Sequence, residues 1–202
     1  MKLKRENELG ILMVVGGPGS SGVSTIAKAL ARHYSLAYIY AGLFMRNMAK
    51  DEGFKTVEDF LRYIDENDLQ GRYDYEIDSK MIQMSFEKNT LIDSKVFAAL
   101  SLSYDIPCTV KIWIDCDLDG RVRRSFEKEG KAFKEDSSEY IDRKNKLLER
   151  YNLDKKRYEG LYGIDYSNPK KYNDIVVDSS RLDVKNTFEL VVKRIKDGGY
   201  IK

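Results

Sequence analysis

Short apolar runs alternate with segments of helical period along most of the chain. Residues 11–15 form an unbroken apolar run that ends in glycines, which is the pattern of a strand covered on both faces in a parallel sheet. From Gly22 to His33 the apolar positions recur at helical spacing, so the chain opens as strand, glycine-rich turn and helix. The expected fold class is α/β, a three-layer arrangement around a five-stranded parallel sheet. The other β-rich runs predict strands at residues 37–40, 90–93, 109–115 and 174–177.

Two long polar segments interrupt this alternation, at residues 54–88 and 121–162. Both have helical period but look too polar for the core, so we interpret them as helical flaps outside it. We find no internal repeat, low-complexity tract or linker that would separate independent domains. A chain of 202 residues is long enough for one substantial core and short for two, so we expect a single domain.

The charge balance excludes some classes of partner. The 35 basic and 33 acidic residues nearly cancel and are interspersed, unlike the basic surface of a nucleic-acid or membrane binder. Cys108 and Cys116 fit no zinc motif, and two thiols without a secretory leader suggest a reducing compartment. Residues 1–8 are charged and precede only a short apolar run, so they predict neither a signal peptide nor a membrane span. We therefore expect a cytoplasmic protein that binds small molecules.

The turn between the first strand and the first helix carries a recognisable motif. Its spacing matches G-x-x-x-x-G-K-[ST], the phosphate-binding loop, except that Val23 stands at the lysine position. Glycines allow successive backbone N–H groups to converge on a phosphate at the positive end of a helix. The motif predicts an ATP-binding loop made of Gly17, Pro18, Gly19, Ser20, Ser21, Gly22, Val23, Ser24 and Thr25.

Ser24 follows the position of the missing lysine, and its hydroxyl is expected to hold Mg²⁺. A glycine-rich connection without any phosphate function is the alternative interpretation. The place of the loop, directly after a buried-type strand and directly before a helix, favours phosphate binding.

Several further motifs follow one another along the chain. They are Thr25-Ile26-Ala27-Lys28, Ala41-Gly42 followed by Arg46, Asp59-Phe60-Leu61-Arg62-Tyr63, Leu91-Ile92-Asp93-Ser94-Lys95-Val96, Ile112-Trp113-Ile114-Asp115, and the run from Arg150 through Asp154 to Arg157-Tyr158. Together with the loop from Gly17 to Thr25 they resemble the cytidylate kinase family, especially its archaeal branch, over nearly the whole chain. The resemblance implies the fold of the P-loop nucleoside monophosphate kinases, with a helical acceptor-binding segment and a helical lid.

The resemblance implies an enzyme that moves the γ-phosphoryl group of ATP onto CMP, with Mg²⁺, as a monomer. Phosphoryl transfer depends on positioning and electrostatic stabilisation, so no protein nucleophile is needed. The resemblance also divides the single domain, residues 1–202, into approximate sub-regions. These are the phosphate loop and core at 10–42, the acceptor-binding helices at 43–88, the lid at 121–165, and the C-terminal strand and helix at 172–202.

The resemblance further implies which residues hold the acceptor. Arg46 and Lys95 would bind its phosphate, and Asp154 would accept hydrogen bonds from its ribose hydroxyls. Asp93 would either contact the acceptor or orient Lys95.

The lid arginines Arg124, Arg150 and Arg157 are the expected catalytic residues, and they would supply the charge that Val23 lacks. Positions 150, 154 and 157 lie at i, i+4 and i+7, so they share one face of a helix that can meet one ligand. The alternative is a solvated ladder of ion pairs that stabilises the helix without touching substrate.

Two departures from the family pattern keep other functions open. Val23 offers no charge, and Lys95 replaces an arginine that would form a bidentate contact with phosphate. The alternatives are a kinase of the same fold for another small acceptor, such as UMP, dCMP, AMP or shikimate, and a nucleotide-binding regulator that has lost transfer.

Overall fold

The computed structural model describes residues 7–67 and 70–201. Its centre is a five-stranded sheet in which every pairing is parallel and the strand order is β2-β3-β1-β4-β5. The predicted α/β fold is confirmed, and no predicted strand boundary is off by more than one residue. The strands are β1 Leu12–Gly16, β2 Ala37–Tyr40, β3 Thr90–Asp93, β4 Val110–Asp115 and β5 Ile175–Asp178.

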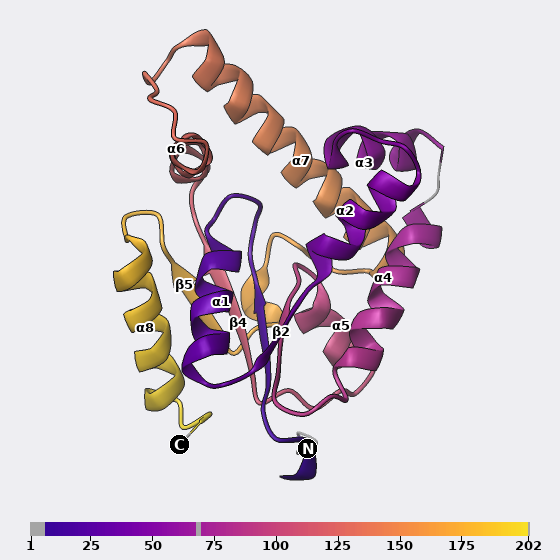
Figure 1. Cartoon of the computed structure of the whole chain (residues 1–202), viewed down its shortest axis with the longest axis vertical. Helices are drawn as coiled ribbons and strands as arrows, with labels where there is room; N and C mark the ends of the chain where they lie inside the picture. Colours follow the sequence, from indigo (N-terminus) through magenta and orange to yellow (C-terminus); the bar gives the residue numbers. More distant parts are fainter. Residues whose placement is uncertain (1–6, 68–69, 202) are drawn as a thin grey trace.

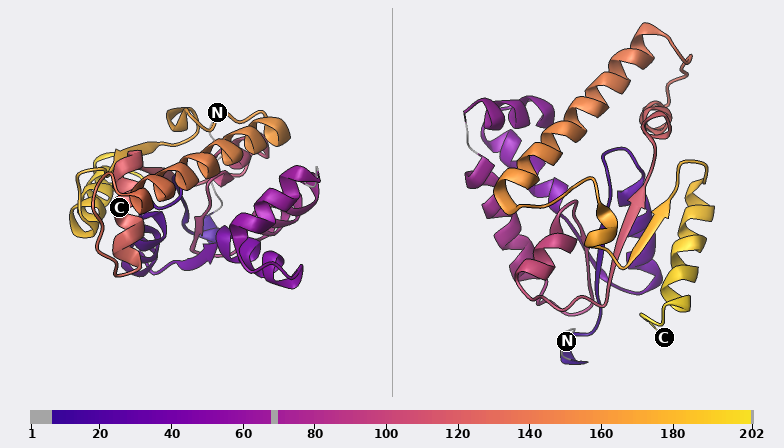
Figure 2. Two further views of the ribbon diagram at one scale, coloured as in Figure 1. Left: turned by 90° about the horizontal axis from the view of Figure 1, so that it is seen from above. Right: turned by 180° about the vertical axis from the view of Figure 1, so that it is seen from behind.

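Helices cover both faces of the sheet, as Figures 1 and 2 show. They connect the parallel strands as crossovers, which is the arrangement that a buried parallel sheet requires. Two short 3₁₀ helices, Asn7–Leu9 and Pro169–Lys171, lie before β1 and before β5. The α-helices are α1 Val23–His33, α2 Ala41–Asp51, α3 Val57–Glu66, α4 Gln70–Met84, α5 Phe97–Ser103, α6 Leu118–Lys128, α7 Ser138–Tyr162 and α8 Val184–Asp197.

The central strand β1 divides its side chains between two cores. Met13 and Val15 pack against α1 and α8 on one face, whereas Leu12 and Val14 pack against α4 and α5 on the other. All four side chains are fully buried. Alternate residues of a strand point to opposite faces, so an unbroken apolar run is what a strand covered on both sides needs.

The interpretation of residues 54–88 and 121–162 as flaps outside the core is wrong in part. Both segments are helical, but α4 places Ile77 and Met81 in the core beside β1. Tyr158 of α7 packs with Trp113 of β4 in a further buried cluster. A helix needs an apolar stripe on only one face, so a polar average composition does not exclude a helix from the core.

Helix α7 is the long helix that links the two ends of one edge of the sheet. It begins at Ser138 beside α6 and extends to α4, so that it crosses above the carboxyl ends of the strands (Figures 1 and 2). Its ends are defined by the N-cap Ser137, whose side chain accepts a hydrogen bond from the Tyr140 N–H, and by Gly163 at φ +64°. No helix in the described part of the chain is both long and apolar enough to span a membrane.

Candidate active site

A cleft of about 1490 Å³ opens at the carboxyl ends of the central strands. Ligands of open α/β sheets bind at this edge, because the loops that leave the strands converge there. Every residue that the sequence analysis assigned to the site lines this cleft. They are Gly17 to Thr25 of the loop, Arg46 of α2, Asp93 and Lys95 after β3, Arg124 of α6, and Arg150, Asp154 and Arg157 of α7.

The loop between β1 and α1 has the geometry that the motif predicts. Gly22 precedes α1 with φ +85°, a conformation that favours glycine. At Gly17 an added Cβ would lie 2.3 Å from the Ile114 carbonyl oxygen, so only glycine fits against β4. No side chain caps the N-terminus of α1, although the Thr25 N–H donates to the Gly22 carbonyl over 3.0 Å, so this helix end has the open form that binds anions. The loop therefore forms a cradle suited to an anion.

Val23 takes the place of the loop lysine and contributes to the core beneath the loop. It is 8% exposed and belongs to the cluster that contains Ile26 and Leu30. One of its methyl groups, Cγ2, would lie 2.5 Å from a Cβ added at Gly17. The valine thus supports the loop from below by packing and contributes no charge to the cleft.

Ser24 lies beside the carboxylate of Asp93. Hydroxyl groups of Ser24 and Tyr38 both interact with this carboxylate, and the Tyr38 hydroxyl donates to Asp93 Oδ2 over 2.6 Å. Burial raises the pKa of Asp93, and the two hydroxyls oppose that shift. A hydroxyl and a carboxylate are hard oxygen ligands of the kind that Mg²⁺ takes together with waters and substrate phosphates. The donor set therefore fits Mg²⁺, although the described residues contain no cluster of three His, Cys, Asp or Glu that could hold a metal unaided.

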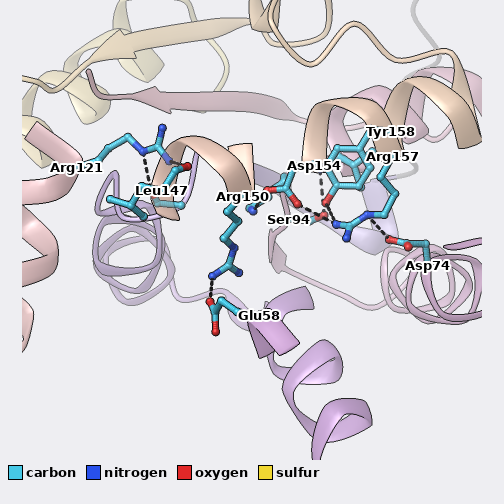
Figure 3. Close-up of polar contacts among 12 residues, drawn as sticks. Glu58, Asp74, Ser94, Arg121, Leu147, Arg150, Asp154, Arg157 and Tyr158 are labelled. Atoms are coloured by element: carbon cyan, nitrogen blue, oxygen red, sulfur yellow. Dashed lines mark hydrogen bonds and ion pairs between the residues drawn. The ribbon is translucent and has the colours of Figure 1, made fainter. Parts of the chain in front are cut away.

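A chain of ion pairs joins the loop after β3 to helices α7 and α4. The Lys95 ammonium pairs with Asp154 Oδ2, and Arg157 Nη2 donates to Asp154 Oδ1 over 2.9 Å. Arg157 Nε lies 3.4 Å from Asp74 Oδ1 (Figure 3). The Arg157, Asp154 and Asp74 side chains are at most 9% exposed, so this part of the network is buried, whereas Arg150 is 34% exposed at its side chain.

Arg150 projects from α7 to α3. Its guanidinium forms an ion pair with Glu58 of α3, as Figure 3 shows. The same two helices are also joined by Lys156 and Asp65, 3.4 Å apart. These two contacts hold the lid helix to α3 in this structure.

Arg46 lies on α2 next to the end of β2. Its Nη2 donates to the Tyr40 hydroxyl over 2.7 Å, and its guanidinium carbon lies 4.9 Å from the centre of the Tyr40 ring. The aromatic ring thus supports the arginine from one face, and the side chain remains in the cleft lining.

Two arginines of α6 hold the loop through backbone oxygens. Arg124 donates to the Ser21, Ser179 and Leu182 carbonyls and to the Ser179 hydroxyl, at 2.5 to 3.0 Å. Arg121 donates from Nε to the Gly19 carbonyl over 2.7 Å and from Nη2 to the Leu147 carbonyl of α7 over 3.3 Å. Arg121 thereby ties the phosphate loop to the lid helix.

The comparisons with known proteins agree with this geometry. A family model described as "AAA domain" matches residues 15–142. A protein named cytidylate kinase from Pyrococcus horikoshii is 31% identical over 90% of this chain and 86% of its own, and one from Thermococcus kodakarensis is 32% identical over the same shares. The chain belongs to the cytidylate kinase family. A crystal structure of shikimate kinase from Bacteroides thetaiotaomicron, 10% identical, matches with a TM-score of 0.56 over 92% of this chain and 98% of its own, which shows the fold alone.

Membership of the cytidylate kinase family confirms the predicted family and the prediction of an enzyme, a nucleoside monophosphate kinase with a P-loop. These curated relatives match over most of their own length, so the likeness is not confined to the phosphate loop.

The sequence analysis did not identify three carboxylates that line the cleft, those of Glu58, Asp74 and Asp78. Asp74 and Asp78 lie at i and i+4 around Ile77, so they interrupt the apolar face of α4, and this is a signal that the sequence does carry. Glu58 carries no comparable signal, because its partner Arg150 is 92 residues away in the chain.

Proposed function

We propose that this protein transfers the γ-phosphoryl group of ATP to CMP, acting as a single-domain monomer. The observation that carries the proposal is that one cleft contains both an anion cradle at the start of α1 and the Lys95–Asp154–Arg157 network. A kinase needs a donor site and an acceptor site that share one cavity from which water can be excluded. All the groups of both sites come from one chain, so no second copy is required.

On the donor side, the loop amides and the N-terminus of α1 bind the ATP phosphates. Ser24 would hold Mg²⁺ through its hydroxyl, and Asp93 would hold waters of the same ion. When bound, such an ion would neutralise negative charge on the ATP phosphates as the phosphoryl group is transferred. Arg121 and Arg124 position the loop, because their guanidinium groups donate to backbone oxygens and keep the cradle open.

On the acceptor side, Arg46 and Lys95 bind the phosphate of the nucleoside monophosphate. Asp154 already accepts bonds from Lys95 and Arg157, and its carboxylate is the acceptor for ribose hydroxyls. Burial would raise the pKa of Asp154, but Lys95 and Arg157 hold it below its usual range, so the group is an anion at neutral pH. An ionised carboxylate is a strong acceptor for sugar hydroxyls.

During transfer, Arg150 and Arg157 stabilise the charge that spreads over the equatorial oxygens of the moving phosphoryl group. They supply the positive charge that Val23 lacks. Arg150 must exchange Glu58 for phosphate to do this, which requires the α7–α3 contact to open and close with each turnover. Arg124, expected from the resemblance to be catalytic, is a positioning residue in this proposal.

A coupled assay of ADP release with Mg·ATP and a panel of acceptors tests the proposal. We expect CMP to stimulate ADP release far more than UMP, AMP or shikimate, with dCMP measured beside it to define the sugar requirement. Selective stimulation by an acceptor other than CMP would replace CMP by that acceptor. Binding of Mg·ATP without turnover of any acceptor would overturn the transfer function.

A further inference from the structure

Helix α4 presents two carboxylates to the cleft on one face. Asp74, Ile77 and Asp78 lie at i, i+3 and i+4, and all three line the cleft. The two carboxylates are nearly buried, with 5% of Asp74 and 8% of Asp78 exposed. Burying a carboxylate costs free energy unless it has a partner, so the burial of each of these two side chains needs an explanation.

The hydrogen bonding of Asp78 leaves one oxygen available. Asp78 Oδ2 accepts a hydrogen bond from the Tyr162 hydroxyl of α7, but no donor among the described residues reaches Oδ1. Asp74 differs, because its Oδ1 pairs with Arg157 and its Oδ2 is buried without a partner. Oδ1 of Asp78, which is not among the buried oxygens that lack a partner, is therefore the oxygen that is open to a ligand in the cleft.

The polar groups of the acceptor side follow one another in a fixed order. Lys95 contacts Asp154, Asp154 contacts Arg157, and Arg157 contacts Asp74, which lies one helical turn from Asp78. The proposed function puts the acceptor phosphate at Lys95 and the ribose at Asp154. Asp78 lines the same cleft and accepts a hydrogen bond from Tyr162 of α7, the helix that also carries Asp154, so it is a polar group of the acceptor side that is left for the base.

Apolar side chains surround this end of the cleft. Met45 of α2 packs with Ile77 of α4 in one cluster and with Val57 and Leu61 of α3 in another, and all four residues line the cleft. Small-ligand pockets are lined mostly by apolar side chains, with a few polar groups that fix the orientation of the ligand.

We propose that Asp78 reads the acceptor base by accepting a hydrogen bond from its exocyclic amine through Oδ1, so that this pocket selects an aminopyrimidine over an oxopyrimidine. The inference rests on the proposed function, because it assumes that a nucleoside monophosphate occupies the acceptor side. Cytosine places an amine at C4, whereas uracil places a carbonyl oxygen there. A carboxylate only accepts hydrogen bonds, so it attracts the amine and repels the carbonyl.

The test compares CMP and UMP with the full-length protein and the variant Asp78→Asn. An amide can turn either its oxygen or its NH₂ group toward the base, so it should accept both pyrimidines while keeping the size of the side chain. A hydrogen bond to a charged group contributes enough for the CMP:UMP ratio of kcat/KM to fall by about tenfold or more in the variant. Glu76→Gln removes a carboxylate from an exposed position of the same helix and should leave the ratio unchanged.

A second variant guards against a folding defect in Asp78→Asn. Tyr162→Phe leaves Asp78 in place but removes the hydroxyl that donates to it, and this hydroxyl favours the ionised carboxyl. We expect the CMP preference of this variant to be weakened near neutral pH and restored in alkaline buffer. A preference that did not respond to either substitution would overturn the assignment.

The outcomes separate this inference from the proposed function. A CMP:UMP ratio of kcat/KM that is the same in the parent and in Asp78→Asn would leave the function standing and overturn the role of Asp78. If the parent phosphorylates neither CMP nor UMP, the proposed transfer to CMP is wrong. The role of Asp78 is then tested separately, by measuring the affinities for CMP and UMP by calorimetric titration. Tighter binding of CMP that Asp78→Asn abolishes would then support it, and equal affinities in the parent would overturn it.

Discussion

The ammonium group of Lys95 forms an ion pair with the carboxylate of Asp154, 59 residues later in the chain. The contact joins the loop after β3 to the lid helix α7, and so it links the acceptor side of the cleft to the element that covers it. Asp154 is only 3% exposed at its side chain, whereas Lys95 is 23% exposed. Removing Lys95 would leave a buried carboxylate with Arg157 as its remaining charged partner, so the two sites are coupled through Asp154.

The pH dependence of acceptor binding should report on Lys95. Burial lowers its pKa to about 8, against the opposing effect of Asp154. The ammonium is therefore present below pH 8 and is lost as the pH rises through that value. We expect the KM for CMP to rise above about pH 8, and the measurement is a series of KM values in buffers from about pH 6.5 to 9.5.

The variant Lys95→Arg tests whether Lys95 causes the rise in the KM for CMP above about pH 8. A guanidinium stays charged across this range and can contact a phosphate through two N–H groups, so activity should be preserved or improved and the rise in KM should disappear. An identical alkaline limb in the parent and in Lys95→Arg would contradict the assignment of Lys95.

Arg150 should matter for turnover far more than for stability. Its side chain is 34% exposed and that of Glu58 is 57% exposed, and such an ion pair contributes about 0–1 kcal/mol to folding. We expect Arg150→Ala to lower kcat at least about 10²-fold, as a charged stabiliser of phosphoryl transfer does. Glu58→Gln should leave kcat within about threefold of the parent, since it releases Arg150 without removing it.

Lys156→Ala provides the control for Arg150, because it breaks the other ion pair between α7 and α3. Urea denaturation and kcat measured on all three variants separate packing from catalysis. Equal losses of kcat in Arg150→Ala and Lys156→Ala would show that only the helix contact matters.

The metal role of Ser24 predicts a difference between two conditions. Ser24→Ala removes one hydroxyl next to Asp93 and leaves the loop amides intact. The variant should lose Mg²⁺-dependent activity, while its affinity for ATP in EDTA changes little. Calorimetry in EDTA and initial rates at several Mg²⁺ concentrations provide the comparison. A loss of ATP affinity as large in EDTA as in Mg²⁺ would exclude a specific metal contact.

The carboxyl group of Asp78 should reduce stability above neutral pH. Burial raises its pKa from 3.8 to about 7, so the folded protein binds a proton more tightly than the unfolded chain does. The free energy of unfolding therefore falls as the pH rises from about 4 to 7. Asp78→Asn cannot ionise and should be more stable than the parent at pH 8 by roughly 1 kcal/mol or more, with little difference near pH 4.

Urea denaturation of Asp78→Asn at both pH values makes that measurement. Glu76→Gln, on the exposed face of the same helix, should change stability little at either pH. A variant Asp78→Asn that was less stable than the parent at pH 8 would show that the carboxylate stabilises the fold.

Local sequence predicted the parts of the site that are contiguous in the chain. The loop from Gly17 to Thr25 needs particular residues in a row, because its conformation depends on the φ angles of its own glycines and on the helix that follows. The strands were also predictable, since a strand buried on both faces must be apolar at every position, as Leu12–Gly16 is. Arg150, Asp154 and Arg157 share a face by helical spacing alone.

Pairings between distant segments depended on the tertiary structure. The sequence alone did not show that Arg150 meets Glu58, that Arg157 meets Asp74, or that Asp78 lines the same cleft as Lys95. The polar composition of residues 54–88 likewise concealed the buried face of α4.

The sequence by itself determined the α/β fold and the phosphate loop, because hydrophobic period and backbone conformation are local properties of the chain. The tertiary structure decided which charges neutralise one another and which remain available to a ligand. Those choices depend on how α3, α4 and α7 pack across the cleft, and packing brings together residues whose separation in the chain carries no information about their distance in space.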